Sequence, residues 1–453
     1  MYDIIIIGAG PGGYVAAIKA AQLGAKVGII EKDALGGICL NHGCIPTKSI
    51  IKSTKVFETL NRSNEFGIHA ENITFDWSSI IKRKDDIVKQ LTSGIGFLLK
   101  KNGVDVFNGY GEIVDKHKVK VNDKTMDAKH IIIATGSSAI IPPIPGAKEA
   151  FESKHLLTSK EILNLKTFPN SLTIIGGGVI GIEFASIFNS LGTKVTLIER
   201  LPSILTTIDE EVVKAYMRKL KKDKINVLTN ANVTNIKEGS VTYEVNDTKH
   251  TIESDLVLMA VGTRANSESF KPLVKMEGSN IITNEYLQTS EKNIYAIGDV
   301  NGKHMLAHVA SMEGIIAVNH ILGKETKPMD YTKIPACIYG SPEIAGMGLT
   351  EREAKEQNID YKVSKVPLGA IGKALADGEK EGFIKLIVDN KYKEVLGVWI
   401  YAYQATELIS EFSLAMHSEA SAYEIANSIH PHPTLSELSL EAALGAIDKP
   451  IHT

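Results

Sequence analysis

Two cysteines with four residues between them are the side chains in this sequence best suited to chemistry. The run GGICLNHGCIPTK, residues 36–48, contains Cys39 and Cys44, and the chain has one further cysteine. The residues after Cys44 carry an apolar helical pattern with Pro46 near its first turn, so we predict a helix that begins just past Cys44. A thiol at a helix N-terminus is favoured as its thiolate. Two such thiols can cycle between dithiol and disulfide.

Two other interpretations of this pair are buried structural cysteines and half of a zinc site. Zinc needs four ligands, and no second cysteine pair or histidine pair at suitable spacing follows, so no metal is predicted. Three cysteines in 453 residues, with no secretion signal at the start, favour a reducing cytoplasmic setting. A net charge of −3 and the lack of an apolar run of about 18 residues argue against nucleic-acid and membrane partners.

The chain opens with the pattern of a dinucleotide-binding unit. The apolar run Ile4–Ile7 predicts a buried parallel strand, and G-x-G-x-x-G follows at Gly8, Gly10 and Gly13. A helical stretch and a second strand come next, and Glu31 closes that strand. Such a turn lets a pyrophosphate approach the helix N-terminus, and the terminal acid can accept a hydrogen bond from a ribose hydroxyl.

The same pattern recurs in the middle of the chain. A strand precedes Gly176, Gly178 and Gly181, and the strand after the next helix ends at Glu199. Glu199 lies 18 residues after Gly181, the interval also found in the first unit. Two units imply two dinucleotides. A carboxylate at the end of the second strand favours NAD over NADP because it repels a 2′-phosphate, and we interpret the neighbouring Arg200 as a solvated charge.

The pattern changes from about residue 333. We expect strands near 383–388 and 395–400 and helices near 406–417 and 422–429, with no third glycine motif, and therefore a different, α+β domain. The segment HPHPTLSE follows and contains His430, His432 and Glu437. Histidine is the usual base for thiol chemistry near neutral pH, and a carboxylate can fix its tautomer. The residues alone give the two histidines equal claims. Upstream, the pattern at 80–100 predicts a long amphipathic helix.

Together these stretches resemble the flavin disulfide reductases, the class I pyridine nucleotide-disulfide oxidoreductases, and within them the dihydrolipoamide dehydrogenases. The resemblance is carried by GAGPGG, GGICLNHGCIPTK, ATG at 134–136, GGGVIG, VGTRAN, YAIGD, MLAH at 305–308 and HPHPTLSE. It implies an α/β fold with two Rossmann-like domains, for FAD and NAD, and a C-terminal α+β dimerisation domain. The expected domains are 1–146 (FAD, first part), 147–266 (NAD), 267–332 (FAD and central, second part) and 333–453 (interface).

The resemblance also implies roles for individual residues. Cys44 would be the sulfur next to the flavin, and Cys39 would exchange with the substrate. His432 would be the base, oriented by Glu437, and it would act on the cysteines of a partner subunit, so that a homodimer is needed for activity.

The other implied residues surround the cofactors. Lys48 would lie near the flavin and pair with Glu183. The implied cofactor-binding residues are Gly8, Gly10, Gly13, Glu31, Lys48, Thr135, Gly136, Asp299, Ala307, Gly176, Gly178, Gly181, Glu199 and Gly262.

The implied reaction is oxidation of protein-bound dihydrolipoamide to lipoamide with reduction of NAD, through FAD and a Cys39–Cys44 disulfide. It would serve a 2-oxoacid dehydrogenase, acetoin dehydrogenase or glycine cleavage complex. One alternative is a reductase of the glutathione-reductase type, which Val179 disfavours because those enzymes carry a tyrosine there. Another is a non-enzymatic redox-sensing flavoprotein, which would need no base. The chain departs from the family pattern at His42, at Gly340-Ser341 and at Pro431.

Overall fold

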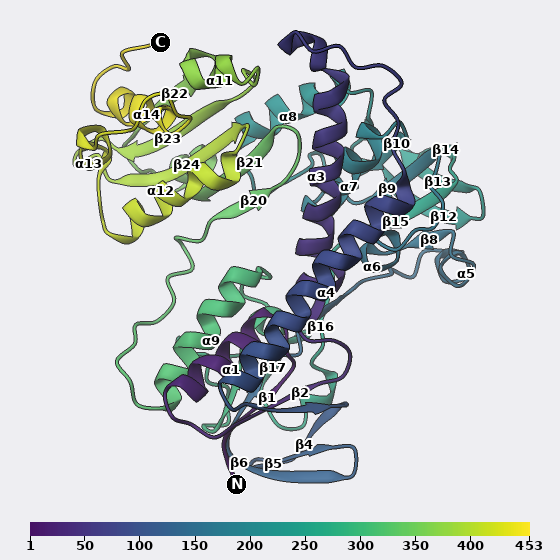
Figure 1. Ribbon diagram of the computed structural model, residues 1–453, viewed down its shortest axis with the longest axis vertical. Coiled ribbons are helices and arrows are strands. Elements are labelled where there is room, and N and C mark those ends of the chain that lie inside the picture. Colours follow the sequence, from purple (N-terminus) through teal and green to yellow (C-terminus); the bar gives the residue numbers. More distant parts are fainter.

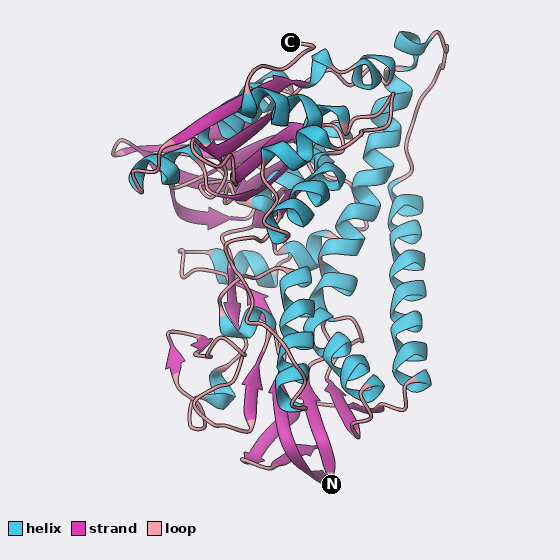
Figure 2. Ribbon diagram, turned by 90° about the vertical axis from the view of Figure 1, so that its left-hand side faces the viewer, coloured by secondary structure: helices cyan, strands magenta, loops and turns pink.

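Three sheets with their helices form three lobes in the computed structural model, which describes residues 1–453 (Figure 1). The N-terminal sheet lies at the bottom of Figure 1, the second sheet at the right and the C-terminal sheet at the upper left. Two long helices, α3 (Cys44–Asn61) and α4 (Trp77–Lys101), extend between the lobes. Figure 2 shows long helices aligned along one edge of the molecule.

The first lobe is built on a sheet of order β3-β2-β1-β6-β5-β4, with β19 paired to β6. Strand β1 (Tyr2–Ile7) is parallel to β2 (Val27–Glu31) and β6 (Lys124–Ile133), and its four isoleucines are buried on both faces. The other elements of the sheet are β3 (Asp105–Asn108), β4 (Gly111–Asp115), β5 (Lys118–Val121) and β19 (Ile294–Ala296). The helical elements of this lobe are α1 (Pro11–Gln22), α2 (Gly37–His42), η1 (Ser63–Phe66), η2 (Glu268–Phe270), η3 (Gly298–Asn301) and α9 (Ala307–Ile321).

Glycines allow α1 and α9 to pack closely in this lobe. A side chain at Gly314 of α9 would come within 2.7 Å of the carbonyl oxygen of Gly12 in α1. This contact joins residues that are 302 positions apart, so the first lobe is completed only when the chain returns after the second lobe.

The second lobe repeats the first in outline. Its sheet has the order β11-β10-β9-β15-β8, and all the pairings are parallel. Its main elements are α5 (Ala147–Glu152), β8 (Leu156–Leu157), α6 (Ser159–Ile162), β9 (Ser171–Ile175), α7 (Val179–Ser190), β10 (Lys194–Ile198), α8 (Glu210–Lys222), β11 (Asn226–Leu228) and β15 (Leu256–Met259). An antiparallel sheet of β12 (Asn232–Lys237), β13 (Ser240–Val245) and β14 (Thr248–Glu253) belongs to the same segment of the chain. Two small ladders lie outside the second lobe in the sequence. One pairs β7 (Ser137–Ala139) with β16 (Thr263–Ala265), and the other pairs β17 (Met276–Glu277) with β18 (Asn280–Ile281).

The C-terminal lobe is an antiparallel sheet of order β20-β21-β24-β23-β22 covered by helices. Its strands are β20 (Ala336–Ile338), β21 (Glu343–Gly348), β22 (Tyr361–Pro367), β23 (Phe383–Asp389) and β24 (Val395–Ala402). Its helices are α10 (Glu351–Glu356), η4 (Leu368–Ala370), α11 (Gly372–Ala376), α12 (Ala405–His417), α13 (Ala422–Asn427) and α14 (Glu437–Ile447).

A buried ammonium joins the C-terminal lobe to the second lobe. The side chain of Lys385 in β23 is 3 % exposed, and its Nζ lies 3.1 Å from both carboxylate oxygens of Asp209 and 2.7 Å from Glu351. Asp209 also caps α8, where it accepts the N–H of Glu211. One charged group therefore connects three elements of two lobes.

Most helices and strands lie where the sequence predicts them, with shifts at their ends. The long helix expected at 80–100 is α4, and a polar N-cap at Asp76 starts it three residues earlier. The helix expected past Cys44 begins at Cys44 itself. Helix α2 was not predicted, because six residues are too few for a periodic pattern. The helix expected at 422–429 ends at Asn427, since Ser428 has extended backbone angles.

None of the helices combines the length and the apolar character that crossing a membrane requires.

Candidate active site

The two thiols of the GGICLNHGCIPTK run lie on consecutive helices. Cys39 is in α2, and Cys44 is the first residue of α3; both are free thiols. Asn41, which lies between them in the sequence, holds the start of α2, because its amide donates to the carbonyl oxygens of Leu35 and Gly37. The 18-residue α3 directs its N–H groups toward the thiol at its start, which favours the thiolate.

The two thiols differ sharply in their acidity. A hydrogen bond from Cys39, helped by the Lys48 ammonium and opposed by burial, lowers the pKa of Cys44 to about 7. The same hydrogen bond raises the pKa of Cys39 far above its ordinary value, and burial raises it further. In the dithiol state the thiolate therefore belongs to Cys44, and Cys39 needs a base to lose its proton.

Lys48 meets Glu183, as the resemblance implies. The Lys48 Nζ lies 3.0 and 2.9 Å from the two carboxylate oxygens of Glu183, whose side chain is 5 % exposed. The contact joins α3 of the first lobe to α7 of the second. A third group completes it: the backbone N–H of Tyr339, just after β20, donates to Glu183 at 3.1 Å, and Nζ lies 4.4 Å from the Tyr339 ring centroid.

The two glycine-rich loops have the same geometry. Oε2 of Glu31 accepts the N–H of Ala9 at 2.7 Å, and Oε2 of Glu199 accepts the N–H of Gly177 at 2.7 Å. In both units the second carboxylate oxygen accepts an N–H two residues further on, from Asp33 and from Leu201. The terminal acid of each unit therefore holds the glycine loop, and each carboxylate oxygen has a lone pair left for a ribose hydroxyl.

The first loop fits the diphosphate of FAD. Gly8 has a φ of 105°, and a side chain there or at Gly13 would collide with neighbouring backbone. A Cβ on Gly10 would have no neighbour nearer than 4.0 Å, so space remains in front of the α1 N-terminus. That position suits a phosphate group, because the first N–H groups of the helix point there.

Further residues of the expected FAD site lie around the same sheet edge. Asp299, in η3 after β19, accepts the Ser137 hydroxyl at 2.6 Å, and burial raises the pKa of Asp299. Thr135 hydrogen-bonds to the Asn266 carbonyl, and Ala307 begins α9. Gly136 has a φ of 65° with open space at its Cβ position.

The second loop is open in the same way. A Cβ at Gly178 or Gly262 would have no neighbour within 4 Å, whereas one at Gly181 would collide with the Gly176 carbonyl. The space before α7 therefore suits a second pyrophosphate. Val179, the first residue of α7, is 41 % exposed, and it stands where a tyrosine would disfavour the present interpretation.

The structure separates the two histidines that the sequence could not rank. The side chain of His430 is 6 % exposed; its Nε2 lies 2.7 Å from Glu411 of α12, and its Nδ1 lies 3.0 Å from the Ser428 carbonyl. The side chain of His432 is 77 % exposed, and only its Nδ1 is held, 2.9 Å from Glu437. His430 therefore anchors the loop, while Nε2 of His432 is free to accept a proton.

A single chain does not bring the base to the thiols. The loop between α13 and α14 lies in the upper left lobe of Figure 1, whereas α3 begins, at Cys44, at its lower end in the middle of the molecule. The expected thiol pair, Lys48 and Glu183 form one site, and the expected base with its carboxylate forms a second site.

His42 carries no charge toward the thiols at neutral pH. Burial, and the charge of Lys160, lower its pKa. Its Nδ1 is buried without a hydrogen-bond partner. His42 therefore lies at the end of α2 as a neutral imidazole.

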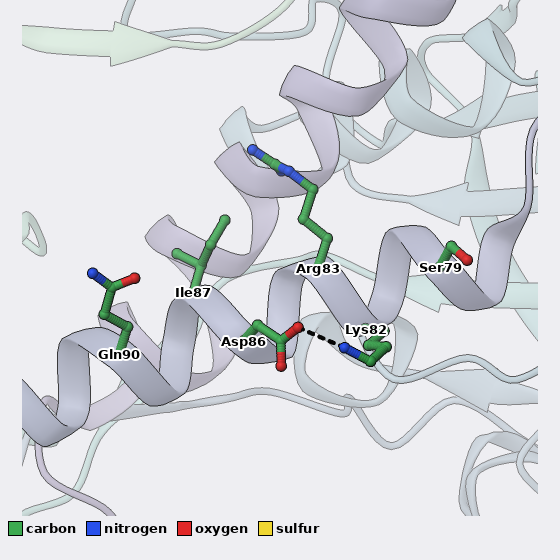
Figure 3. Close-up of a pocket in the computed structure, with 6 residues that line it drawn as sticks. All are labelled: Ser79, Lys82, Arg83, Asp86, Ile87 and Gln90. Atoms are coloured by element: carbon green, nitrogen blue, oxygen red, sulfur yellow. Dashed lines mark hydrogen bonds and ion pairs between the residues drawn. The ribbon is translucent and has the colours of Figure 1, made fainter.

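Helix α4 supports the thiol-bearing helix α3. Figure 3 shows Arg83 pointing away from α4 toward the neighbouring helix, beside a shallow surface pocket. Its Nη1 donates to the carbonyl and the hydroxyl of Ser49, 3.0 and 2.9 Å away. Lys82 and Asp86 pair with each other across one helical turn at 2.9 Å. This pocket is lined by residues of α4 and contains none of the expected site residues.

Sequence patterns did not predict several residues of the site. Tyr339 follows a short strand and touches Lys48 across more than 290 residues. Glu411 pairs with His430, and Glu313 of α9 accepts the N–H of Gly298, which precedes Asp299. Each is an isolated polar residue in an ordinary element, so only the tertiary contact reveals its role.

Two dinucleotide loops that flank a dithiol, together with a histidine–glutamate pair on a separate lobe, define an oxidoreductase that passes electrons between two nucleotide cofactors and a disulfide. Residues 2–314 match the family described as pyridine nucleotide-disulphide oxidoreductase, and residues 334–443 match its dimerisation domain. The chain belongs to this family. It is an oxidoreductase whose cofactors are FAD and NAD.

Curated relatives and solved structures agree with this assignment. A dihydrolipoyl dehydrogenase of Acholeplasma laidlawii is 57% identical over 73% of this chain and 99% of that protein. A dihydrolipoyl dehydrogenase of Bacillus subtilis is 42% identical over 100% of this chain and 99% of its own length. The crystal structure of LpdA from Mycobacterium tuberculosis superposes with a TM-score of 0.90 at 26% identity, over 97% of this chain and 98% of that one.

Proposed function

We propose that this chain is a dihydrolipoyl dehydrogenase that oxidises protein-bound dihydrolipoamide to lipoamide and reduces NAD. The observation that carries the proposal is the unequal thiol pair, in which Cys44 holds the thiolate and Cys39 holds the proton. This inequality determines which of the two sulfurs leaves as the thiolate during the exchange. The full-length relatives that bear this enzyme's name support it.

The chain's own groups account for the thiol–disulfide exchange. His432 of the partner subunit takes a proton from one substrate thiol, and the resulting thiolate attacks the Cys39 sulfur of the disulfide. The Cys39–Cys44 bond breaks and Cys44 leaves as the thiolate, which is the better leaving group because of its lower pKa. The second substrate thiol then gives up its proton and attacks the substrate sulfur of the mixed disulfide. The bond from that sulfur to Cys39 breaks, Cys39 leaves and takes up the proton as its thiol, and lipoamide is released. FAD, when bound, supplies the path by which the electron pair of the dithiol reaches NAD.

Lys48 and Glu437 orient the reacting groups in this scheme. The Lys48 ammonium, held by Glu183, stabilises the Cys44 thiolate. Glu437 accepts the Nδ1 proton of His432, which leaves the Nε2 lone pair exposed as the base.

The active form in this proposal is a homodimer. Within one chain the loop that carries His432 and the start of α3 lie in different lobes, so a second copy supplies the base. Apolar residues around that loop favour a covered face: Ile429 is 99 % exposed and Leu414 of α12 is 70 % exposed. The dimerisation-domain match at 334–443 supports the same arrangement.

The cellular setting in this proposal is a cytoplasmic multienzyme complex. The lipoyl group would belong to a 2-oxoacid dehydrogenase, acetoin dehydrogenase or glycine cleavage complex. The three cysteines, with a dithiol at the active site, suit a reducing compartment.

One steady-state comparison tests the activity. We expect rapid turnover of dihydrolipoamide with NAD and little turnover of glutathione disulfide with NADPH. The reverse preference would reject the proposal in favour of a low-molecular-weight disulfide reductase.

The histidine assignment has its own test. We expect His432→Gln to lose dihydrolipoamide turnover by about 10²-fold or more, while NADH still reduces the bound flavin. Equal loss of both activities would contradict the role of His432 as base. Loss of turnover in His430→Gln, with His432→Gln unaffected, would assign the base to the other histidine.

A further inference from the structure

The segment after β20, residues 339–343, makes three side-chain contacts with α3, and the proposed reaction assigns no role to any of these contacts. Tyr339 contacts Lys48, Ser341 contacts Glu58 at 3.4 Å, and Glu343 pairs with Lys55 at 2.6 Å. Positions 48, 55 and 58 share one face of the helix because their spacings of seven and three are helical. This segment contains the Gly340-Ser341 pair that departs from the family pattern.

The departure at Gly340 fits this docking. Gly340 is buried, and a Cβ on it would overlap the hydroxyl of Tyr216 in α8. Ser341 in turn directs its hydroxyl toward Glu58. The segment is therefore enclosed between α3 of the first lobe and α8 of the second lobe.

Tyr339 touches both members of the Lys48–Glu183 pair, and it does so through different atoms. Its backbone N–H donates to Oε1 of Glu183 at 3.1 Å, and its ring centroid lies 4.4 Å from the Lys48 Nζ. An aromatic face attracts an ammonium through its quadrupole but carries no net charge. The ring can thus hold Lys48 in place without neutralising it, which a second carboxylate could not do.

The position of the Lys48 charge matters to the thiols. The ionisable groups that act on the Cys44 thiol are Cys39 from α2, Lys48 from α3 and Glu183 from α7, and of these only Lys48 brings a positive charge. Glu183 opposes the thiolate, so the balance depends on which side of the pair faces Cys44. The Lys48 side chain is 30 % exposed, so it is not enclosed on all sides, and its contacts with Glu183 and Tyr339 set its direction.

We propose that Tyr339 is a positioning residue for the redox centre: its ring and its backbone N–H hold the Lys48–Glu183 pair so that the ammonium faces the Cys44 thiolate. The C-terminal lobe thereby controls the thiol chemistry within its own chain, in addition to supplying a base to the partner. This inference rests on the proposed function only in its choice of Cys44 as the thiolate that faces the flavin.

The test compares Tyr339→Phe, which keeps the ring, with Tyr339→Leu, which removes it, in the FAD-loaded dimer. The two-electron-reduced protein, prepared with dithionite, is titrated with pH while the long-wavelength absorbance of the thiolate–flavin pair is followed. We expect the apparent pKa of Cys44 in Tyr339→Leu to rise by about 0.5 unit or more, and Tyr339→Phe to titrate like the parent protein. Flavin content and dimer mass should be unchanged in both.

Two outcomes of this comparison would overturn the proposal: a parental titration in Tyr339→Leu, or equal shifts in both variants. If Tyr339→Leu fails to retain flavin, Tyr339→Met, which fills similar space without a ring, provides the same comparison. A double-mutant cycle with Lys48→Met tests whether Tyr339 acts on the Cys44 thiol directly or through Lys48. The double variant should shift no further than Lys48→Met alone, and an additive shift would contradict action through Lys48.

The titration needs no lipoyl substrate. A protein that shows the expected titrations but does not oxidise dihydrolipoamide would refute the proposed function and leave the role of Tyr339 supported. A protein that oxidises dihydrolipoamide but shows identical titrations in all variants would support the proposed function and refute the role of Tyr339.

Discussion

The hydrogen bonds of Glu437 predict a specific effect for its amide replacement. Oε1 lies 2.9 Å from Nδ1 of His432, and Oε2 accepts the backbone N–H of Thr434 at 3.0 Å. In Glu437→Gln only one of these atoms remains an acceptor, and the fixed Thr434 N–H requires it. The amide nitrogen then faces Nδ1, which must become the acceptor, so the imidazole proton moves to Nε2. The base is held in the wrong tautomer.

The cost of this change has two parts. Restoring the productive tautomer breaks one hydrogen bond, worth about 1–1.5 kcal/mol net. Loss of the carboxylate charge beside the imidazolium costs about 1 kcal/mol once solvent screening of the exposed His432 is allowed for. The sum, roughly 2–2.5 kcal/mol, corresponds to a fall of about 30- to 70-fold in kcat/KM for dihydrolipoamide.

Glu411→Gln is the matched control, because it makes the same chemical change on the partner of the other histidine. We expect it to lower the melting temperature, since Glu411 helps to hold the buried His430, and to leave turnover within about threefold of the parent. The assay is steady-state oxidation of dihydrolipoamide, with NADH reduction of the flavin as the internal reference. A loss under about fivefold in Glu437→Gln, or equal losses in both variants, would refute this reasoning.

Three further predictions concern the thiolate, the junction between lobes and the second glycine loop. The long-wavelength absorbance of the reduced holoenzyme should be present above the Cys44 pKa of about 7 and lost as the pH falls below it. A band that does not change between about pH 5.5 and 8.5, roughly 1.5 units on either side of that pKa, would contradict the thiolate assignment. Lys385→Met should lower the free energy of unfolding by about 3–5 kcal/mol in denaturant titrations, because it leaves the buried Asp209 carboxylate without its ammonium partner. An unchanged denaturation midpoint would show that the Lys385 cluster does not contribute to stability. Gly178→Ala should weaken NADH binding without changing the melting temperature, since its Cβ points into open space, whereas Gly181→Ala should lower both the NADH affinity and the melting temperature, since its Cβ would collide with backbone. Calorimetry with NADH measures the affinity, and equal behaviour of the two variants would contradict the loop geometry.

The local elements of both nucleotide units were predictable because their information is short-range. A buried parallel strand is apolar on both faces, and a tight turn before a helix needs glycine, so Ile4–Ile7 and Gly8 indicate their structure within a few residues. The interval of 18 residues from Gly13 to Glu31 and from Gly181 to Glu199 reflects one helix and one strand. The structure gives the two acids matching hydrogen bonds to their loops.

Short elements and helix ends were less predictable. Helix α2 has six residues and its only buried side chain is Leu40, so no periodicity marks it. Helix α13 stops at Asn427 although the apolar pattern continues to Ile429, which is 99 % exposed. In the proposed dimer a second copy covers that side chain, which explains why an apolar residue stands at a position exposed in the single chain.

The sequence by itself determined the thiol pair, the two glycine loops and the histidine-rich C-terminal segment, because each lies within a few consecutive residues whose types suffice for the chemistry. Only the tertiary structure distinguished His430 from His432, since the difference is burial and a contact with Glu411 on another helix, and the choice of His432 as base is a proposal built on that difference. It alone placed Tyr339 on Lys48, because a pairing across three lobes leaves no pattern along the chain. It also distinguished the two thiols by their acidity, since a proton shared between Cys39 and Cys44 depends on their orientation and on the ammonium beside them.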